Sequence, residues 1–345
     1  MYQNRKRGFV MKKILSLLTA VTVMVAALAA CGGNSGGSGG GDKGAAAVDT
    51  NTVAVGAVVI ARDDIPEADI YALVSAIFEN KDAITEQHAK GGELDLEFAS
   101  SVTSVPYHPG AAKYFSEKGK DVAAVKDGAG AGESKALTFG TGGESGTYYG
   151  FGGVLSSYVS NNTGVSVTAV TSGGSKANIE DLAAGDVQLG FVQSDVMSYA
   201  YNGERLFDSA VTGFSVVAAL YMEQVQIVTT NPDIKSVADL AGKSVSIGDR
   251  GSGVWFNAVD VLGAYGIDPD SGISPVFQGF SDSAESLKDG KIDAAFVVAG
   301  APTTAIVDLA TSKPVYLVGL DEEHTNDLLA ASPYYSAYTI PAGTY

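Results

Sequence analysis

The chain has 345 residues, with 39 acidic and 22 basic side chains, a formal net charge of −17 and one cysteine. A protein this acidic is a poor partner for nucleic acid or for an anionic membrane surface, because both are polyanions. A single cysteine excludes a disulfide within the chain.

The first predicted element is a lipoprotein signal peptide over residues 1–30. Lys12 and Lys13 precede an apolar run that ends in small residues before Cys31. The run is too short and wrongly flanked for a membrane span. Residues 28–31, Leu-Ala-Ala-Cys, resemble the lipobox of bacterial lipoproteins. We therefore expect a lipidated Cys31 that anchors an extracytoplasmic protein; the alternative is an ordinary signal peptide with an incidental cysteine.

Residues 31–50 are rich in Gly and Ser and predict a flexible tether. The leader carries five basic residues and no acidic ones, so its removal changes the net charge from −17 to −22. The rest of the chain, about 295 residues from residue 51, suits two lobes of ordinary domain size.

The remaining sequence alternates β-branched runs with runs of helical period. In the first block we expect a strand at 52–64, helices at 66–84 and 108–119, and then a linker at 119–135. After the linker we expect strands at 136–141, 165–172, 187–195, 213–230, 244–249, 274–280, 292–300 and 314–320, and helices at 147–162, 175–186, 236–243, 253–266, 281–290 and 302–311. This alternation predicts an α/β fold with parallel strands and right-handed crossovers. The run at 213–230 is long enough to cross from one lobe to another.

Ligands of open α/β sheets lie beyond the carboxyl ends of the strands. Five loops leave a strand and enter a helix: 140–147, 171–177, 193–196, 248–254 and 300–303. Four of these five loops are rich in Gly and Ser. Backbone N–H groups at helix N-termini suit a carboxylate or another anion. The sequence therefore favours a binding site for a small anion.

The Gly-rich loop 140–147 does not fit three other chemistries. Ser145 stands where a dinucleotide fingerprint has its third glycine, no lysine follows as in a nucleotide P-loop, and there is no Gly-x-Ser-x-Gly elbow. The histidines, His88, His108 and His324, and one cysteine form neither a zinc motif nor an evident catalytic base. We expect no enzyme activity, no cofactor and no metal.

Polar side chains of these loops have two interpretations each. Arg250 can clamp a carboxylate, or it can be a solvated arginine paired with Asp249. Asp195, which follows Gln193 at a strand end, can bind a ligand amino group or cap the next helix.

Aromatic side chains begin two of the helices, directly after Gly-rich loops. Tyr148 and Trp255 can wall a pocket and hydrogen-bond a ligand, or they can pack between helix and sheet. The complete set of candidate ligand-binding residues is Gly142, Gly143, Ser145, Gly146, Tyr148, Ser172, Gly173, Gln193, Asp195, Arg250, Ser252, Gly253, Trp255 and Pro302.

Several stretches resemble the solute receptors of TRAP transporters, in the TAXI branch. They include "LTFGTGGESGTYYGFGGVLSSYV", "TSGGSKANIEDLAAGDVQLGFVQSD", "IGDRGSGVWFNAVDVLGAYG" and "VAVGAVVIARDDIPEADIYALVSAIFEN". The resemblance covers about residues 50–118 and 136–345. It implies a periplasmic-binding-protein-like (type II) fold of two α/β lobes with a hinge and a ligand cleft. Lobe 1 would comprise 57–118 plus 136–225, and lobe 2 would comprise 226–345 plus 51–56.

The same resemblance implies a receptor without enzyme activity or cofactor. Its ligand would be a small carboxylate such as glutamate, glutamine or another organic acid. Its partner would be an ion-coupled TRAP permease in the membrane, and we expect the receptor to be a monomer. A sensory or surface lipoprotein that has this fold and works without a permease is the alternative.

The order of the stretches departs from the family pattern. In the family, the "FGTGG" strand comes first and "IPAGTY" is followed closely by "VAVGAVV". Here the "VAVGAVV…HPGAAKYF" block stands in front and "IPAGTY" ends the sequence. We therefore expect a circularly permuted order, with the usual termini joined through 119–135; a natural, an engineered and an assembly origin all fit the sequence.

Overall fold

The computed structural model describes residues 48–125, 130, 136–205 and 207–345. The chain divides into two units, residues 1–41 and 42–345, and everything described belongs to the second. The predicted signal peptide, Cys31 and most of the predicted tether lie outside the described residues, as does part of the predicted linker. In the described part of the chain, no helix combines the length and the apolar character needed to cross a membrane.

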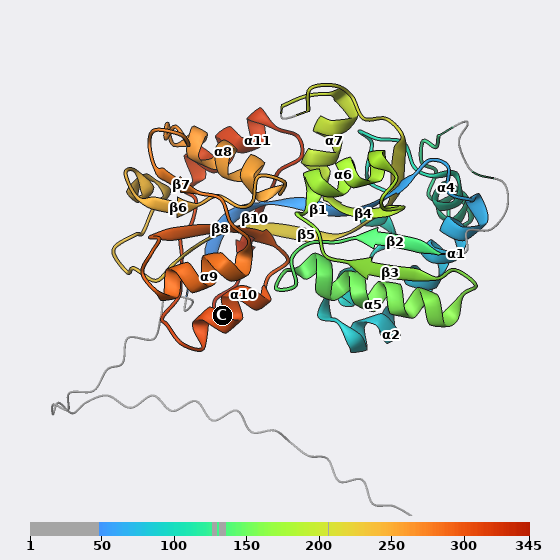
Figure 1. The fold of residues 1–345 in the computed structure, drawn as a ribbon, viewed down its shortest axis with the longest axis horizontal. Helices are drawn as coiled ribbons and strands as arrows, with labels where there is room; N and C mark the ends of the chain where they lie inside the picture. The colour runs from blue at the N-terminus through green and yellow to red at the C-terminus, as the bar shows by residue number, and fades with distance from the viewer. Residues whose placement is uncertain (1–47, 126–129, 131–135, 206) are drawn as a thin grey trace, which may run out of the picture. The chain divides into compact units, whose positions relative to one another are not determined.

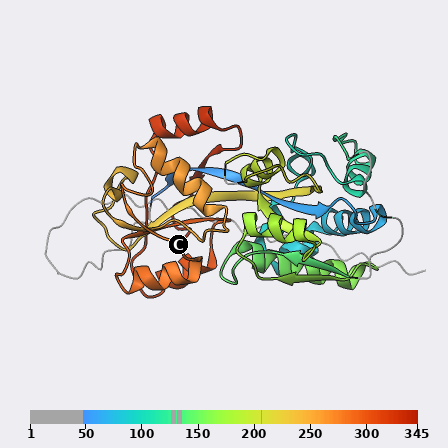
Figure 2. The same ribbon diagram turned by 45° about the horizontal axis from the view of Figure 1, so that its top comes forward.

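Two long strands, β1 (Thr50–Arg62) and β5 (Phe214–Thr229), form the centre of the described structure. They pair antiparallel from Ala54–Gln224 to Arg62–Phe214. Their lengths of 13 and 16 residues are two to three times the mean strand length of about 5–6 residues. Both strands run from one lobe into the other (Figure 1 and Figure 2).

The two lobes have separate apolar cores that share these strands. On β1, Val53 and Val55 pack in one core, and residues 57–61 pack in the other. On β5, residues up to Tyr221 belong to the first lobe and Val225 belongs to the second. The cores therefore change over near residue 56 on β1 and residues 222–224 on β5.

Lobe 1 contains the sheet order β3-β2-β4-β1-β5, in which β2 is parallel to β3 and β4, and β1 is antiparallel to β4. Helix α5 packs on β3, and α6 packs on β4. The further elements of this lobe are α1 (Glu67–Phe78), α2 (Lys81–Gln87), η1 (Ala89–Glu93), α3 (Leu96–Ala99), α4 (Pro109–Glu117), β2 (Leu137–Gly140), α5 (Thr147–Asn162), β3 (Val167–Val170), α6 (Ser175–Ala184), β4 (Leu189–Gln193) and α7 (Ser194–Asn202).

The single helix predicted at 66–84 is wrong, because the structure has two helices there. Helix α1 ends at Phe78 and α2 begins at Lys81. Between them, the side-chain Nδ2 of Asn80 donates to the carbonyl oxygen of Ala76 at 2.9 Å. A short polar side chain that bonds the backbone in this way competes with continuation of the helix.

Lobe 2 contains the sheet order β5-β8-β6-β7, with β6 parallel to both β7 and β8. Strand β9 pairs with β5, and β10 pairs with β1. Its elements are η2 (Val237–Leu240), β6 (Ser244–Ser246), α8 (Val254–Ala264), β7 (Ser274–Val276), α9 (Phe280–Lys288), β8 (Ala294–Ala299), α10 (Thr304–Ala310), β9 (Tyr316–Leu317), α11 (Glu322–Ala331) and β10 (Ser336–Ile340).

The α/β fold of two lobes predicted from the sequence is confirmed. Helix α11 and strand β10 were not predicted. Strand β10 is exposed at four of its five positions, so it lacks the apolar pattern by which strands are recognised. We keep the division at 56/57 and 225/226 as a proposal, because the two apolar cores change over in these regions.

The first part of the predicted linker is hydrogen-bonded to lobe 1. The Tyr107 N–H donates to the Ala123 carbonyl oxygen at 2.7 Å, and the Val125 N–H donates to the Tyr107 carbonyl oxygen at 2.9 Å. Farther along, the Gly130 N–H donates to the Asp64 carbonyl oxygen at 3.1 Å. Residues 119–125 therefore belong structurally to lobe 1.

Asn178 joins the loop after β2 to β4, and its loss should destabilise lobe 1. Its buried Nδ2 donates to the carbonyl oxygens of Thr141 and Phe191, at 2.8 and 2.7 Å. We expect Asn178→Ala to lower the free energy of unfolding by about 2 kcal/mol, because two buried acceptors lose their donor. Urea denaturation measures this change. In the control Asn162→Ala, an exposed helix-end bond is lost, and the change should stay within about 0.5 kcal/mol; equal effects would contradict the assigned role.

Candidate ligand-binding site

A cavity of about 100 Å³ lies between the two lobes. Its wall consists of the loops that lead into α5, α6, α8 and α9, together with the ends of β4 and β8 and the middle of β5. The described residues that line it include no lysine, arginine or histidine. Among the groups that line the cavity, only backbone N–H groups and neutral polar side chains can therefore offer partial positive charge to a ligand.

Four helices begin at this cavity with a glycine as the N-cap residue. They are α5 with Gly146, α6 with Gly174, α8 with Gly253 and α9 with Gly279, and all four glycines line the cavity. Among the described residues, no side chain caps any of the four. The first N–H groups of a helix have no partner within it, and they carry a partial positive charge. The cavity is therefore suited to an anionic group.

A buried acid, Glu223 on β5, lines the same cavity. Its side chain is 2% exposed, and the Tyr148 hydroxyl donates to its Oε2 at 2.7 Å. Burial raises the pKa of Glu223 to about 8, against the opposing effect of the Tyr148 hydrogen bond. The Tyr148 ring is held by stacking on Phe191, with centroids 4.7 Å apart.

The lobes approach closely at Gln193 and Gly253. Gln193 ends β4 in lobe 1, is 2% exposed, and its Oε1 has no hydrogen-bond partner. Gly253 precedes α8 in lobe 2, and a Cβ atom there would overlap the Gln193 carboxamide and crowd Ser175 Oγ. A side chain at position 253 would therefore require the Gln193 carboxamide to move aside or the two lobes to separate.

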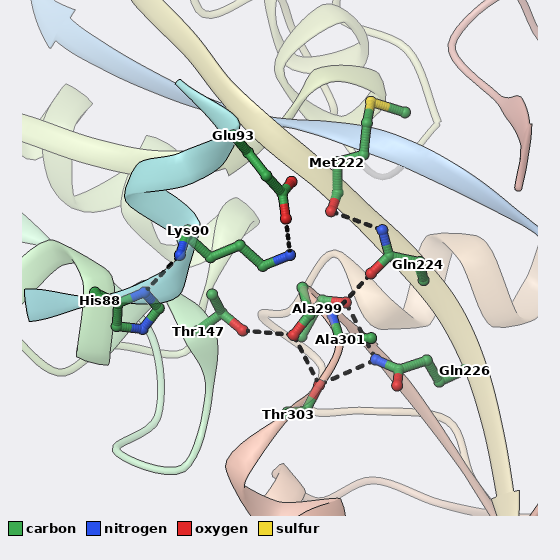
Figure 3. Close-up of polar contacts among 11 residues, drawn as sticks. His88, Lys90, Glu93, Thr147, Met222, Gln224, Gln226, Ala299, Ala301 and Thr303 are labelled. Carbon is green, nitrogen blue, oxygen red and sulfur yellow. Dashed lines mark hydrogen bonds and ion pairs between the residues drawn. The ribbon is translucent and has the colours of Figure 1, made fainter. Parts of the chain in front are cut away.

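Hydrogen bonds from lobe 1 and from β5 hold the loop after β8 (Figure 3). Thr147 Oγ1 of lobe 1 donates to the Gly300 carbonyl oxygen at 3.1 Å. The Ala301 N–H donates to Gln224 Oε1 on β5 at 2.7 Å, and Gln226 on the same strand donates to this loop as well. The loop lies next to the cavity and joins the two lobes on this side.

The structure brings nine of the fourteen candidate residues together in the cavity wall. They are Gly142, Gly143, Gly146, Tyr148, Ser172, Gly173, Gln193, Ser252 and Gly253. Eight of them come from four of the five predicted loops, and Tyr148 follows the first of these loops in α5.

The other five candidates lie outside the cavity wall. Ser145 accepts a hydrogen bond from Ser281 of lobe 2 at 2.8 Å. The Arg250 guanidinium lies 3.7 Å from the centre of the Phe277 ring. Trp255 is half-buried beside the ring of the next residue, and Pro302 stands in the loop after β8.

Asp195, the fifth of these, is fully buried at the start of α7. Its Oδ2 accepts a hydrogen bond from Asn257 of lobe 2 at 2.9 Å, and its Oδ1 has no partner. Burial raises the pKa of Asp195 to about 7. This acid therefore faces the other lobe rather than the cavity.

Twelve residues that line the cavity were not among the candidates. They are Thr147, Gly174, Ser175, Glu223, Gly248, Asp249, Val254, Gln278, Gly279, Phe280, Val298 and Ala299. Glu223 carried a usable signal, because it is the one charged residue of the apolar run at 213–230. In the described residues, no group of three or more His, Cys, Asp and Glu side chains is placed to hold a metal ion.

The fold and cavity define a two-lobed α/β protein that can enclose a small molecule. A model of the NMT1-like family matches residues 40–119 and 139–345. The chain belongs to the NMT1-like family.

Solved structures with partial similarity include three binding proteins. The alkanesulfonate-binding protein SsuA from Xanthomonas axonopodis pv. citri, bound to MOPS, is 18% identical over 56% of this chain and 63% of its own, with a TM-score of 0.38. An ancestral arginine-binding protein bound to arginine is 18% identical over 54% of this chain and 79% of its own, with a TM-score of 0.39. The amino acid receptor AbpA from Streptococcus pneumoniae, bound to L-arginine, is 15% identical over 54% and 76%, with a TM-score of 0.36. This chain thus spans less than two thirds of the length of SsuA.

The close approach at Gly253 can be tested by adding one methyl group. Gly253→Ala should shift the protein in solution towards a more open arrangement, because the new Cβ overlaps Gln193. Small-angle scattering should then give a larger radius of gyration than for the wild type. The double variant Gly253→Ala with Gln193→Ala removes the overlap and should restore the wild-type profile.

Gly263→Ala is the matched control, since Gly263 lies in the same helix with open space around its Cβ position. It should leave the scattering profile unchanged. If Gly253→Ala also left it unchanged, the lobes would not hold this approach in solution.

Proposed function

We propose that the protein is an extracytoplasmic solute receptor that binds a small carboxylate between its lobes. The observation that supports this most strongly is the convergence of four helices, each with a glycine N-cap, on one cavity. Unpaired N–H groups at helix N-termini bind a carboxylate without a basic side chain, and the described lining residues offer none.

The size of the cavity supports a small ligand. Its volume of about 100 Å³ is well below the roughly 300–1,000 Å³ of sites for drug-sized molecules. An amino acid such as glutamate or glutamine, or another organic acid of similar size, is the ligand class we propose. The protein would bind this solute without converting it.

We further propose that the receptor is of the TAXI type and delivers its ligand to a TRAP permease. This part rests on the sequence resemblance over residues 50–118 and 136–345. The alternative is a permease-independent surface lipoprotein with the same fold. A permease gene beside the gene of this protein would favour the TAXI-type receptor.

The permuted order is also a proposal. Strand β10 pairs antiparallel with β1, from Ala54–Ser336 to Thr50–Ile340. In addition, the Ala342 N–H donates to Asp49 Oδ1 at 2.9 Å. The two segments that the family order joins directly are therefore neighbours in space, which supports a rearrangement with an unchanged fold.

A thermal-shift screen tests the carboxylate proposal. Amino acids, dicarboxylates and sugars are each added to the purified protein. A ligand present at 100 times its dissociation constant adds about 2.7 kcal/mol to the free energy of unfolding, which raises the melting temperature by several degrees. We expect small acids to produce this shift; a shift with sugars alone would contradict the proposal.

Gly146→Val should abolish the shift, because a Cβ at this position already lies 3.3 Å from the Phe280 ring across the cavity. Gly153→Val, where a Cβ has no neighbour within 4 Å, is the matched control in the same helix and should still respond.

The proposed lipid anchor depends on Cys31, which lies outside the described residues. In a bacterial host, the wild type should incorporate labelled palmitate and sediment with membranes, and Cys31→Ser should do neither. An unlabelled wild type would favour the alternative of an ordinary signal peptide.

A further inference from the structure

The Glu223 carboxylate stands at the floor of the cavity, where β5 crosses between the lobes. Its single hydrogen bond to a described residue is the one from Tyr148, to Oε2. Glu223 is nevertheless 2% exposed. An ionised carboxylate with so little solvation is costly unless a cation or further donors reach it.

No basic side chain among the described residues supplies that cation. The Lys90 ammonium group acts on the pKa of Glu223 but is paired with Glu93 at 2.5 Å (Figure 3). It lies 5.4 Å from the centre of the Tyr221 ring. Lys90 does not line the cavity, and its charge is largely balanced by Glu93. The described residues thus leave two ways to neutralise the Glu223 carboxylate, which are a bound proton and a positive group of the ligand.

The titratable groups around Glu223 come from several elements. Tyr148 on α5, Asp195 on α7 and Lys90 on η1 all act on its pKa, and Tyr221 lies on the same strand. Burial and the Asp195 charge raise the pKa of Glu223 to about 8, and Tyr148 and Lys90 oppose this rise.

A second acid of the cavity wall, Asp249, lines it from lobe 2, and burial raises its pKa as well. The charged side chains that line the cavity are therefore acidic ones alone. Its backbone offers helix N-termini to a negative group. An α-amino acid zwitterion has one ammonium group and one carboxylate group, both bonded to the same Cα atom.

Two amide side chains in the wall also lack partners. Gln193 Oε1 and Gln278 Nε2 are buried atoms with no hydrogen bond among the described residues, and both residues line the cavity. A buried polar atom without a partner is unusual, and an ordered water or a polar group of a ligand can satisfy it.

We propose that Glu223 determines the specificity of the cavity by binding the ammonium group of an α-amino acid, whose carboxylate lies at the glycine-capped helix N-termini. This inference rests on the proposed receptor function and narrows its ligand class from carboxylates to zwitterions. Asp249 lies at the other wall and does not carry this role.

Proton release follows from this arrangement. Free Glu223 is mostly protonated at neutral pH, because its pKa is raised to about 8, and an adjacent ammonium group lowers that pKa. Ligand binding should therefore expel a proton from Glu223 to solvent, and affinity should rise from pH 6 to about pH 8 and then level off.

Calorimetric titration with matched probes tests the proposal. The probe pairs are L-glutamate with glutarate and L-alanine with propionate, which differ by the amino group. For the wild type we expect the amino acid of at least one pair to bind at least about tenfold more tightly than its partner, the effect of one charged hydrogen bond. Glu223→Gln should reduce this preference to less than about twofold.

Two variants separate Glu223 from other acids. Glu86→Gln, at an exposed position on α2, should keep the wild-type preference. Asp249→Asn should also keep a preference for the amino acid, and loss of that preference in Asp249→Asn alone would move the ammonium position to Asp249 and overturn the proposal.

Glu223→Gln should be folded, with a melting temperature above that of the wild type at pH 8.5, because ionisation of an acid with a raised pKa destabilises the unliganded fold.

Titrations in buffers of different ionisation enthalpy count the released protons. At pH 7 the wild type should release close to one proton per ligand, and Glu223→Gln should release none. Equal binding of amino acids and their deaminated partners to the wild type would overturn the Glu223 proposal and leave the carboxylate receptor standing. Absence of binding by every acid in the thermal screen would instead overturn the receptor function itself.

Discussion

The antiparallel pairing of β1 with β5 is the constraint on which the rest of the structure depends. These two strands belong to the sheets of both lobes, and their apolar residues are divided between the two cores. On their outer edges β1 pairs with β4 and β10, and β5 pairs with β8 and β9. The two strands can therefore be buried because their backbone N–H and C=O groups have partners on both sides. The pairing also fixes the cavity, because Glu223 stands on β5 at the point where the cores change over.

Small residues at the cavity serve two purposes that follow from the same geometry. A glycine N-cap leaves the first N–H groups of a helix without a side-chain partner, and it also lets the opposite lobe come close. Gly253 shows both effects, since it begins α8 and lies against Gln193 of lobe 1. Gly174, with a φ of 96°, adds a backbone conformation that other residues rarely adopt. The residues that we propose to bind an anion are therefore also residues at which the two lobes come close.

Buried acids near the lobe boundary make the unliganded arrangement sensitive to pH. Glu223 and Asp195 have pKa values raised to about 8 and about 7, in both cases chiefly by burial. An acid with a raised pKa binds its proton more tightly in the folded state, so its contribution to stability falls as the pH rises from the unfolded value through the folded one. A cationic group brought by a ligand would reverse this effect at Glu223, where the cavity is open to it. Asp195 is instead bonded to Asn257 of the other lobe.

The sequence by itself determined the α/β class, the alternation of strands and helices, and the loops that form the cavity, because periodicity and glycine placement are local properties of the chain. Nine of the residues that it proposed as ligand-binding lie together in the cavity wall, but only the tertiary structure decided which side chains face inward. Arg250 lies over Phe277, although its loop reaches the cavity. Glu223 is the one charged residue of the apolar run at 213–230, but only the folded structure shows that it lines the cavity. Strand β10 could not be predicted from local sequence either, since its position depends on pairing with β1 at the far end of the sequence. The direction of a side chain and the partner of an edge strand depend on contacts between residues far apart in the chain. Local sequence patterns cannot predict such contacts.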